Sequence, residues 1–147
     1  MNDLSIRART VTHNLLRIVA GALFMEHGAQ KLFGLLGGHP VELMSRMGLA
    51  GVLEFFGGAL IVLGLLTRPV AFIVAGEMAV AYFTAHFPRG FWPIQNRGEP
   101  AALYCFIYLF FAAHGAGAFS LDALLRRRRD PDAIDARGEA VMGLPAD

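Results

Sequence analysis

The stretch "GVLEFFGGALIVLGLLTRPVAFIVAGEMAVAYFTAHF", residues 51–87, decides the fold. It holds two apolar segments, 51–66 and 69–87, which are too long for strands and do not alternate strictly between apolar and polar residues. Both are therefore predicted to be helices. Only "LLTRPV" is available to connect them, with Thr67 suited to the N-cap and Pro69 to the first turn of the second helix. The two helices must then be antiparallel neighbours.

Two further apolar segments, residues 15–36 and 100–119, complete the pattern. A bilayer core of roughly 30 Å needs about 20 mainly apolar residues per helix, and the four segments meet or approach that length. The chain of 147 residues is 55% hydrophobic with a mean hydropathy of +0.48, above an ordinary soluble domain. We predict an all-α fold in which residues 13–125 form an integral membrane four-helix bundle. Residues 1–12 would be a basic lead-in, and residues 126–147 a basic and then disordered tail.

The placement of the basic residues predicts the orientation of the bundle. The alternating path of four helices puts nine arginines on the side of the two termini and leaves four basic residues for the other side. Because basic residues favour the cytoplasmic side, both termini are predicted to be cytoplasmic. The nine are Arg7, Arg9, Arg17, Arg68, Arg126, Arg127, Arg128, Arg129 and Arg137, and the four are Lys31, Arg46, Arg89 and Arg97.

Several kinds of chemistry find no support in the sequence. The single cysteine, Cys105, excludes a C-x-x-C redox pair and therefore the four-helix membrane thiol oxidants. No phosphate-binding loop, nucleophile elbow or zinc-ligand spacing occurs, so no metal site is expected. Haem is not favoured, because its axial ligands would be His27 and His114, whose depths match only loosely. The run of four arginines is expected to contact anionic lipid rather than nucleic acid.

Charged and polar residues interrupt the first apolar segment. Glu26, His27, Gln30 and Lys31 fall within an arc of about 140° at about 100° per residue, and we call them the polar stripe. A charged side chain near the bilayer centre costs about 2.5 to 3.5 kcal/mol on the insertion scale, so it needs a partner or a function. The stripe is therefore predicted to face the interior of the bundle.

Glu54 is the natural partner for this stripe, since it lies at a depth similar to that of Lys31. An ion pair between the two is expected, and a purely structural pair that fixes the helix register is the alternative. Gly57 and Gly58 follow on nearly the same face and would let a backbone or a flat ligand come close. On the last helix Tyr104 and Tyr108 are neighbours four residues apart.

Glu77 lies near the middle of segment 69–87. It is either a proton-coupling residue, as Glu26 also could be, or a protonated and hydrogen-bonded acid of the helix core.

Four segments in order resemble the DoxX family of small four-helix bacterial membrane proteins: "HGAQKLFG" (27–34), "LEFFGGALIVLGLLTRP" (53–69), "NRGEPAALY" (96–104) and "GAGAFSLD" (115–122). The resemblance implies a multi-pass protein of the bacterial inner membrane in a quinone-linked oxidoreductase setting, concerned with sulfur compounds or redox defence. The family pattern favours Asn-Gly-Gly-Glu where this chain has Asn96-Arg97-Gly98-Glu99.

Residue pattern and resemblance together suggest a quinone-headgroup site in the outer half of the bundle. Lys31, His27 or Tyr104 would donate to a quinone carbonyl, and Glu54 or Glu99 would relay protons. The candidate catalytic residues are Glu54, His27 and Lys31. The candidate cofactor-binding residues are Gly57, Gly58, Tyr104, Tyr108, Glu99 and Asn96.

Three functions compete. The first is a membrane subunit of a quinone-linked oxidoreductase, which would need a partner oxidoreductase subunit or a soluble redox enzyme because the chain has no electron donor of its own. The second is a non-catalytic membrane anchor for soluble redox enzymes. The third is a proton-coupled small-molecule transporter, assembled as a homo-oligomer, with Glu26 or Glu77 as the coupling acid.

Overall fold

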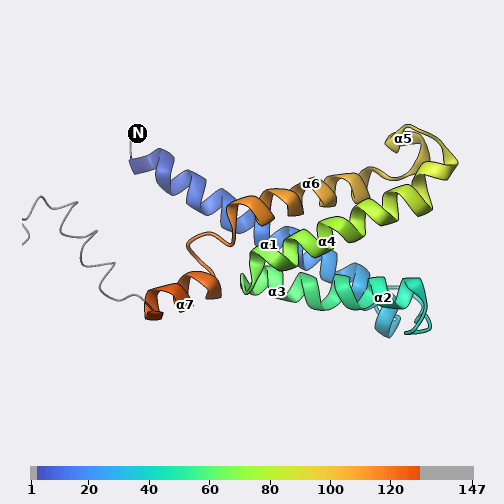
Figure 1. The fold of residues 1–147 in the computed structure, drawn as a ribbon, viewed down its shortest axis with the longest axis horizontal. Coiled ribbons are helices and arrows are strands. Elements are labelled where there is room, and N and C mark those ends of the chain that lie inside the picture. Colours follow the sequence, from blue (N-terminus) through green and yellow to red (C-terminus); the bar gives the residue numbers. More distant parts are fainter. Residues whose placement is uncertain (1–2, 130–147) are drawn as a thin grey trace, which may run out of the picture.

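A computed structural model describes residues 3–129, and every regular element among them is helical (Figure 1). Helix α1 spans Asp3–Phe33. Helix α2 (Arg46–Val52), a π-helical turn (Leu53–Gly57) and α3 (Gly58–Leu63) form one continuous helix. The next helix is α4 (Thr67–Ala81), continued by a π-helical turn (Tyr82–His86) and a 3-10 turn (Phe87–Arg89). Helices α5 (Pro93–Asn96), α6 (Glu99–His114) and α7 (Leu121–Arg129) follow.

Two of these helices are long and apolar enough to cross a membrane by length and composition: Arg46–Leu63 with 18 residues and Thr67–Arg89 with 23. Glu99–His114 is apolar but shorter. The predicted all-α class is confirmed for residues 3–129. The number of membrane crossings and the orientation of the termini stay predictions.

The first helix differs most from its prediction of 15–36. It begins at Asp3, so the lead-in of residues 1–12 is helical from that point. Thr10 and Thr12 bond to carbonyls one turn earlier, and residues 3–12 contain no glycine or proline to stop the helix. The helix ends at Phe33 because Gly34 takes a left-handed φ of 65°, three residues before the predicted end at residue 36.

The central hairpin also has shifted ends. Helix α2 begins at Arg46 rather than at residue 51, because Ser45 caps it by accepting a 3.0 Å bond from the Gly48 amide. Gly64, with φ 67°, ends α3 before the predicted residue 66. The prediction that Thr67 is an N-cap is wrong, since Thr67 is already the first residue of α4.

Helix α6 is shorter than predicted, and a further helix, α7, follows it. Helix α6 ends at His114 rather than at residue 119, because Gly115 takes φ 80°. Residues 126–129, predicted to begin the tail, belong to α7. The predicted disorder from residue 130 onward lies outside the described residues.

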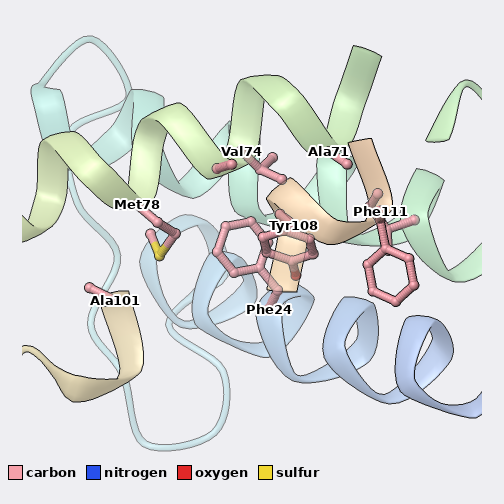
Figure 2. Packing of buried hydrophobic residues seen from close by; sticks show 9 residues of the cluster. Phe24, Ala71, Val74, Met78, Ala101, Tyr108 and Phe111 are labelled. Carbon is pink, nitrogen blue, oxygen red and sulfur yellow. The ribbon is translucent and has the colours of Figure 1, made fainter. Parts of the chain in front are cut away.

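The helices pack mainly as two pairs, α1 along the α2–α3 helix and α4 along α6 (Figure 1). The apolar core joins the pairs: Phe24 of α1 packs on Tyr108 of α6 with ring centroids 4.9 Å apart, next to Val74 of α4 (Figure 2). The fully buried Tyr108 hydroxyl donates a 3.0 Å bond to the Ala20 carbonyl of α1. This bond satisfies the only polar atom of the Tyr108 side chain within the core.

Glycines let α1 and the α2–α3 helix approach closely. A Cβ placed on Gly28 would lie 2.7 Å from the Gly51 carbonyl oxygen, and one on Gly58 would lie 2.7 Å from the Gly21 carbonyl oxygen. Small residues allow this backbone contact, which a side chain of any size would break. Gly76 of α4 is different, since a Cβ there meets no heavy atom within 4 Å.

A buried arginine connects three segments at the end of α3. Arg17 of α1 is 1% exposed and donates to the carbonyls of Ile61, Val62 and Phe119. The first two carbonyls belong to the last turn of α3, where helix carbonyls need partners from outside the helix, and the Ile61 carbonyl also accepts a 3.0 Å bond from the Gly64 amide. Arg17 therefore holds the end of α3 and the segment after α6 against α1.

Asp122 completes this junction. Its two carboxylate oxygens accept bonds of 2.8 and 2.9 Å from the amides of Leu66 and Thr67, at the start of α4. Its own amide donates a 2.9 Å bond to the Gly64 carbonyl. The cap that the sequence assigned to Thr67 thus comes from a side chain 55 residues further on.

The glycine contacts make a direct prediction. We expect Gly28→Ala to lower the free energy of unfolding by about 1–3 kcal/mol, because the added methyl group would overlap backbone atoms. Gly76→Ala is the matched control and should leave stability unchanged or raise it by up to ~1 kcal/mol through helix propensity. Thermal unfolding in detergent measures both, and equal effects at the two positions would contradict this packing.

Candidate functional site

The expected ion pair between α1 and the central helix is present. Lys31 Nζ contacts Glu54 Oε1. Glu54 is 3% exposed, whereas the Lys31 side chain keeps 21% of its surface accessible. Glu54 Oε2 is also buried and has no hydrogen-bond partner among residues 3–129. Lys31 therefore holds one oxygen of this carboxylate, and the other oxygen is buried without a partner among the described residues.

Glu54 lies in the π-helical turn Leu53–Gly57. A π-helical turn adds one residue to a helical turn, which rotates the side chains that follow, and such turns often occur at functional sites. Gly51, one turn before Glu54, lies against the Lys31 side chain, and a Cβ placed on Gly51 would lie only 3.0 Å from Lys31 Cβ. The lysine stem thus lies over Gly51, and its ammonium reaches Glu54.

Glu77 of α4 provides a second acid close to this pair. It is half-buried and interacts electrostatically with Glu54 and Lys31. Its Oε2 atom is buried and, like Glu54 Oε2, has no hydrogen-bond partner in the described part of the chain. The region around Glu54 thus brings together two carboxyl groups and an ammonium group, and each carboxyl group has one oxygen without a partner there.

The aromatic residues of α6 border the same region. Tyr104 stacks on Tyr108 with ring centroids 5.8 Å apart, and it meets the His27 ring edge to face with centroids 6.3 Å apart. Tyr108 uses its hydroxyl on the Ala20 carbonyl, so this residue is a packing element rather than a free donor. Tyr104 is half-buried and remains the candidate donor of the two.

The polar stripe does not face the interior as a whole, and that prediction is wrong. Glu26 and His27 are exposed, and Gln30 bonds to the Leu36 carbonyl in the loop that follows. Only Lys31 joins a buried group. The reason is that the face of α1 with Gly21, Phe24 and Gly28 is the one that packs on the neighbouring helices. His27 still interacts electrostatically with Glu54 from the edge of the site.

Gly57 and Gly58 serve helix packing. A Cβ on Gly57 would lie 2.8 Å from Val74 Cγ1, and the space beside Gly58 is taken by the α1 backbone at Gly21 and Met25. The close approach of a backbone, one of the two expectations for these glycines, is thus present at Gly58.

Asn96 organises the loop before α6. This 1% exposed side chain donates to the Gly90 carbonyl at 2.7 Å and accepts from the Gly98 amide at 2.7 Å. Its partners all lie in residues 82–98, and none belongs to the Lys31–Glu54 pair. Glu99 begins α6 and is exposed. The family pattern places glycine at position 97, and Arg97 does adopt a left-handed φ of 60° there.

Sequence reasoning misses two groups that position this site, Arg17 and Asp122. The count of basic residues places Arg17 at the membrane surface, although a charge inside an apolar segment signals a buried partner. Asp122 ends the "GAGAFSLD" segment and gives no local signal for a cap on a helix 55 residues earlier. Within residues 3–129, no three His, Cys, Asp or Glu side chains gather as metal ligands.

The apolar helices and the charged pair held between them define a small helical membrane protein. The DoxX family model matches residues 13–87, just over half of the 147 residues, and the chain belongs to the DoxX family. The resemblance drawn from the sequence is thereby confirmed.

Two relatives extend this assignment. An uncharacterized protein of Haemophilus influenzae is 43% identical over 114 residues, which cover 73% of this chain and 85% of that protein. Inner membrane protein YqjF of Escherichia coli strain K12 is 31% identical over 127 residues, which cover 76% of this chain and 90% of that protein. No solved structure gives a significant match. The family and the second relative assign the chain to the bacterial inner membrane.

The left-handed backbone at position 97 generates a prediction. Arg97→Gly should raise the free energy of unfolding by about 1 kcal/mol, because a side chain costs about 1–2 kcal/mol in this conformation and glycine adopts it freely. Arg97→Ala keeps the Cβ and removes the charge, so it should give no such gain. Thermal unfolding of both variants separates backbone strain from charge.

The ion pair generates another prediction. Lys31→Met and Glu54→Gln should each lower the free energy of unfolding by about 1–3 kcal/mol, because each leaves a buried polar group without its partner. The free energy of unfolding lost in the double variant should be smaller than the sum of the two single losses, by at least about 1 kcal/mol. Unfolding in detergent gives this coupling, and strictly additive losses would mean that the contact contributes nothing to stability.

Proposed function

We propose that this protein is the membrane subunit of a quinone-linked oxidoreductase, with the quinone headgroup held near the Lys31–Glu54 pair. The observation that carries the proposal is the buried and unpartnered oxygen of Glu54, next to a second such oxygen on Glu77. Native proteins rarely leave buried polar atoms unpaired, and each exception calls for a ligand, a water molecule or a catalytic role.

The residues present suit a quinone headgroup chemically. A quinone, when bound, supplies an acceptor for two electrons and two protons and offers two carbonyl oxygens to hydrogen-bond donors. Tyr104 and His27 carry donors at the border of the site, and Lys31 carries an ammonium group with 21% of its side chain accessible. Glu54 and Glu77 are the groups able to hold and move a proton next to them.

In this proposal the two acids have different tasks. Glu54 is fixed by Lys31 on one oxygen, so its other oxygen has a defined position for exchanging a proton. Glu77 is coupled to Glu54 electrostatically, and a proton on one of them favours a negative charge on the other. His27 and Glu26, which are exposed, connect the site with the surface of α1.

The membrane arrangement that goes with this function is a four-helix bundle with both termini in the cytoplasm. The helices would be α1, the α2–α3 helix, the helix from Thr67 to Arg89, and α6. The electrons would come from a partner oxidoreductase subunit or a soluble redox enzyme. The competing function is an anchor for such enzymes, in which the ion pair is only a structural brace.

Quinone retention tests the proposal. The protein is isolated in native-lipid discs, and quinone per protein is measured by mass spectrometry against the bulk-lipid ratio. We expect an excess in the wild type that falls by roughly tenfold in Glu54→Gln and in Lys31→Met, the size expected for one lost hydrogen bond to a charged group.

Two controls make this test specific. Glu42→Gln applies the same chemical change to an exposed acid in the loop before α2 and should keep the excess. Lys31→Arg should keep most of it, because the pair with Glu54 survives. Quinone at the bulk-lipid ratio in the wild type would reject the site and favour the anchor.

A further inference from the structure

A cleft of about 620 Å³ shares no lining residue with the Lys31–Glu54 pair. Its walls are the α3–α4 turn, the end of α6 and helix α7, which meet on the α7 side of the molecule (Figure 1). The proposed function does not use this cleft, and its lining differs from that of the ion-pair site.

Arginines dominate the polar lining. Among residues 3–129, four arginines line the cleft, together with a single acid, Asp122. The carboxylate of Asp122 is committed, because both of its oxygens accept from backbone amides at the start of α4. The described lining therefore contains no carboxylate oxygen that is free to pair with the four guanidinium groups. They are Arg68, Arg126, Arg128 and Arg129.

The arginines come from two elements in a fixed relation. Arg68 is on α4 and lies over Gly115, where a Cβ would be 3.2 Å from its Nε. The other three are on α7, whose first turn is held by the Asp122 bonds to Gly64, Leu66 and Thr67. The cleft is thus built by tertiary contacts and is more than a run of basic residues on one helix.

The remaining lining is apolar and continues onto an exposed apolar surface. Leu65, Leu66, Pro69 and Leu125 form this part of the cleft. Next to it, Leu121, Leu124 and Phe119 are exposed, with Phe119 at 67%. Along α7 the leucines come first and the four arginines follow at its C-terminal end. The cleft therefore has cationic donors and hydrocarbon contacts side by side.

From this combination we infer that the cleft binds the phosphate of an anionic phospholipid, with Arg68 and the α7 arginines as donors and the leucines against its acyl chains. Guanidinium groups form paired, charge-assisted bonds to phosphate oxygens. A soluble phosphate would use the arginines alone and leave the apolar wall without a partner, which is why a lipid is favoured.

Arg127 supplies a matched control. It belongs to the same run of four arginines on α7 but does not line the cleft. A general attraction between a basic helix and an anionic surface would depend on Arg127 as much as on its neighbours. A site formed by the side chains that line the cleft would not depend on Arg127.

The test counts phospholipid bound to the full chain. The protein in detergent is titrated with phosphatidylglycerol, and bound lipid is counted by native mass spectrometry, with phosphatidylcholine as the neutral comparison. We expect phosphatidylglycerol to bind more tightly than phosphatidylcholine. Arg68→Gln and Arg128→Gln should each weaken phosphatidylglycerol binding about fivefold, and Arg127→Gln less than twofold.

Three outcomes would overturn the inference: equal losses from Arg127→Gln and Arg128→Gln, no preference for phosphatidylglycerol, or displacement of bound lipid by inorganic phosphate. The last would assign the cleft to a soluble phosphate compound. Thermal unfolding of each variant without added lipid confirms that the fold is kept, which the exposed positions of these arginines lead us to expect.

Discussion

The bonds from Arg17 to the carbonyls of α3 and of Phe119 are the constraint on which the rest of the structure depends. The last carbonyls of a helix have no partners within it, and in hydrocarbon no water replaces them. By donating to two of them, the carbonyls of Ile61 and Val62, Arg17 fixes where α3 ends against α1. Asp122 does the corresponding work for the first amides of α4. The hairpin of the two central helices is thus held at its turn by one cation and one anion.

This anchoring sets the register that brings the ion pair together. On α1 the contacts to the central helix repeat as Arg17, Gly21 and Gly28, and their counterparts are Val62, Gly58 and Gly51. A step of seven residues along α1, from Gly21 to Gly28, matches a step of seven back along the other helix. Two antiparallel helices in such a heptad register stay in contact along their length. Lys31 and Glu54 meet because the register established at Arg17 is kept along α1 as far as its last turn, which contains Lys31.

Periodicity and charge predict much of this from the sequence, including the all-α class and the Lys31–Glu54 pair. The helix ends are harder to predict, because α4 is capped by Asp122, which is distant in sequence. The buried face of α1 is harder still. The cost of polar groups in an apolar segment predicts that Glu26 and His27 are buried together with Lys31. The glycine contacts instead decide which face of α1 packs, and those contacts depend on the shape of the neighbouring helix.

The depth of Glu54 explains why it needs a lysine partner. The helix from Arg46 to Leu63 has 18 residues, about 27 Å at 1.5 Å per residue, which is close to the thickness of a bilayer core. Glu54 is near its middle and 3% exposed, so the carboxylate is removed from solvent within the fold. Lys31 combines a long apolar stem over Gly51 with a charge that meets Glu54, and it keeps part of its surface accessible. One oxygen of Glu54 is thereby stabilised between the helices, and the other is buried without a hydrogen-bond partner among residues 3–129.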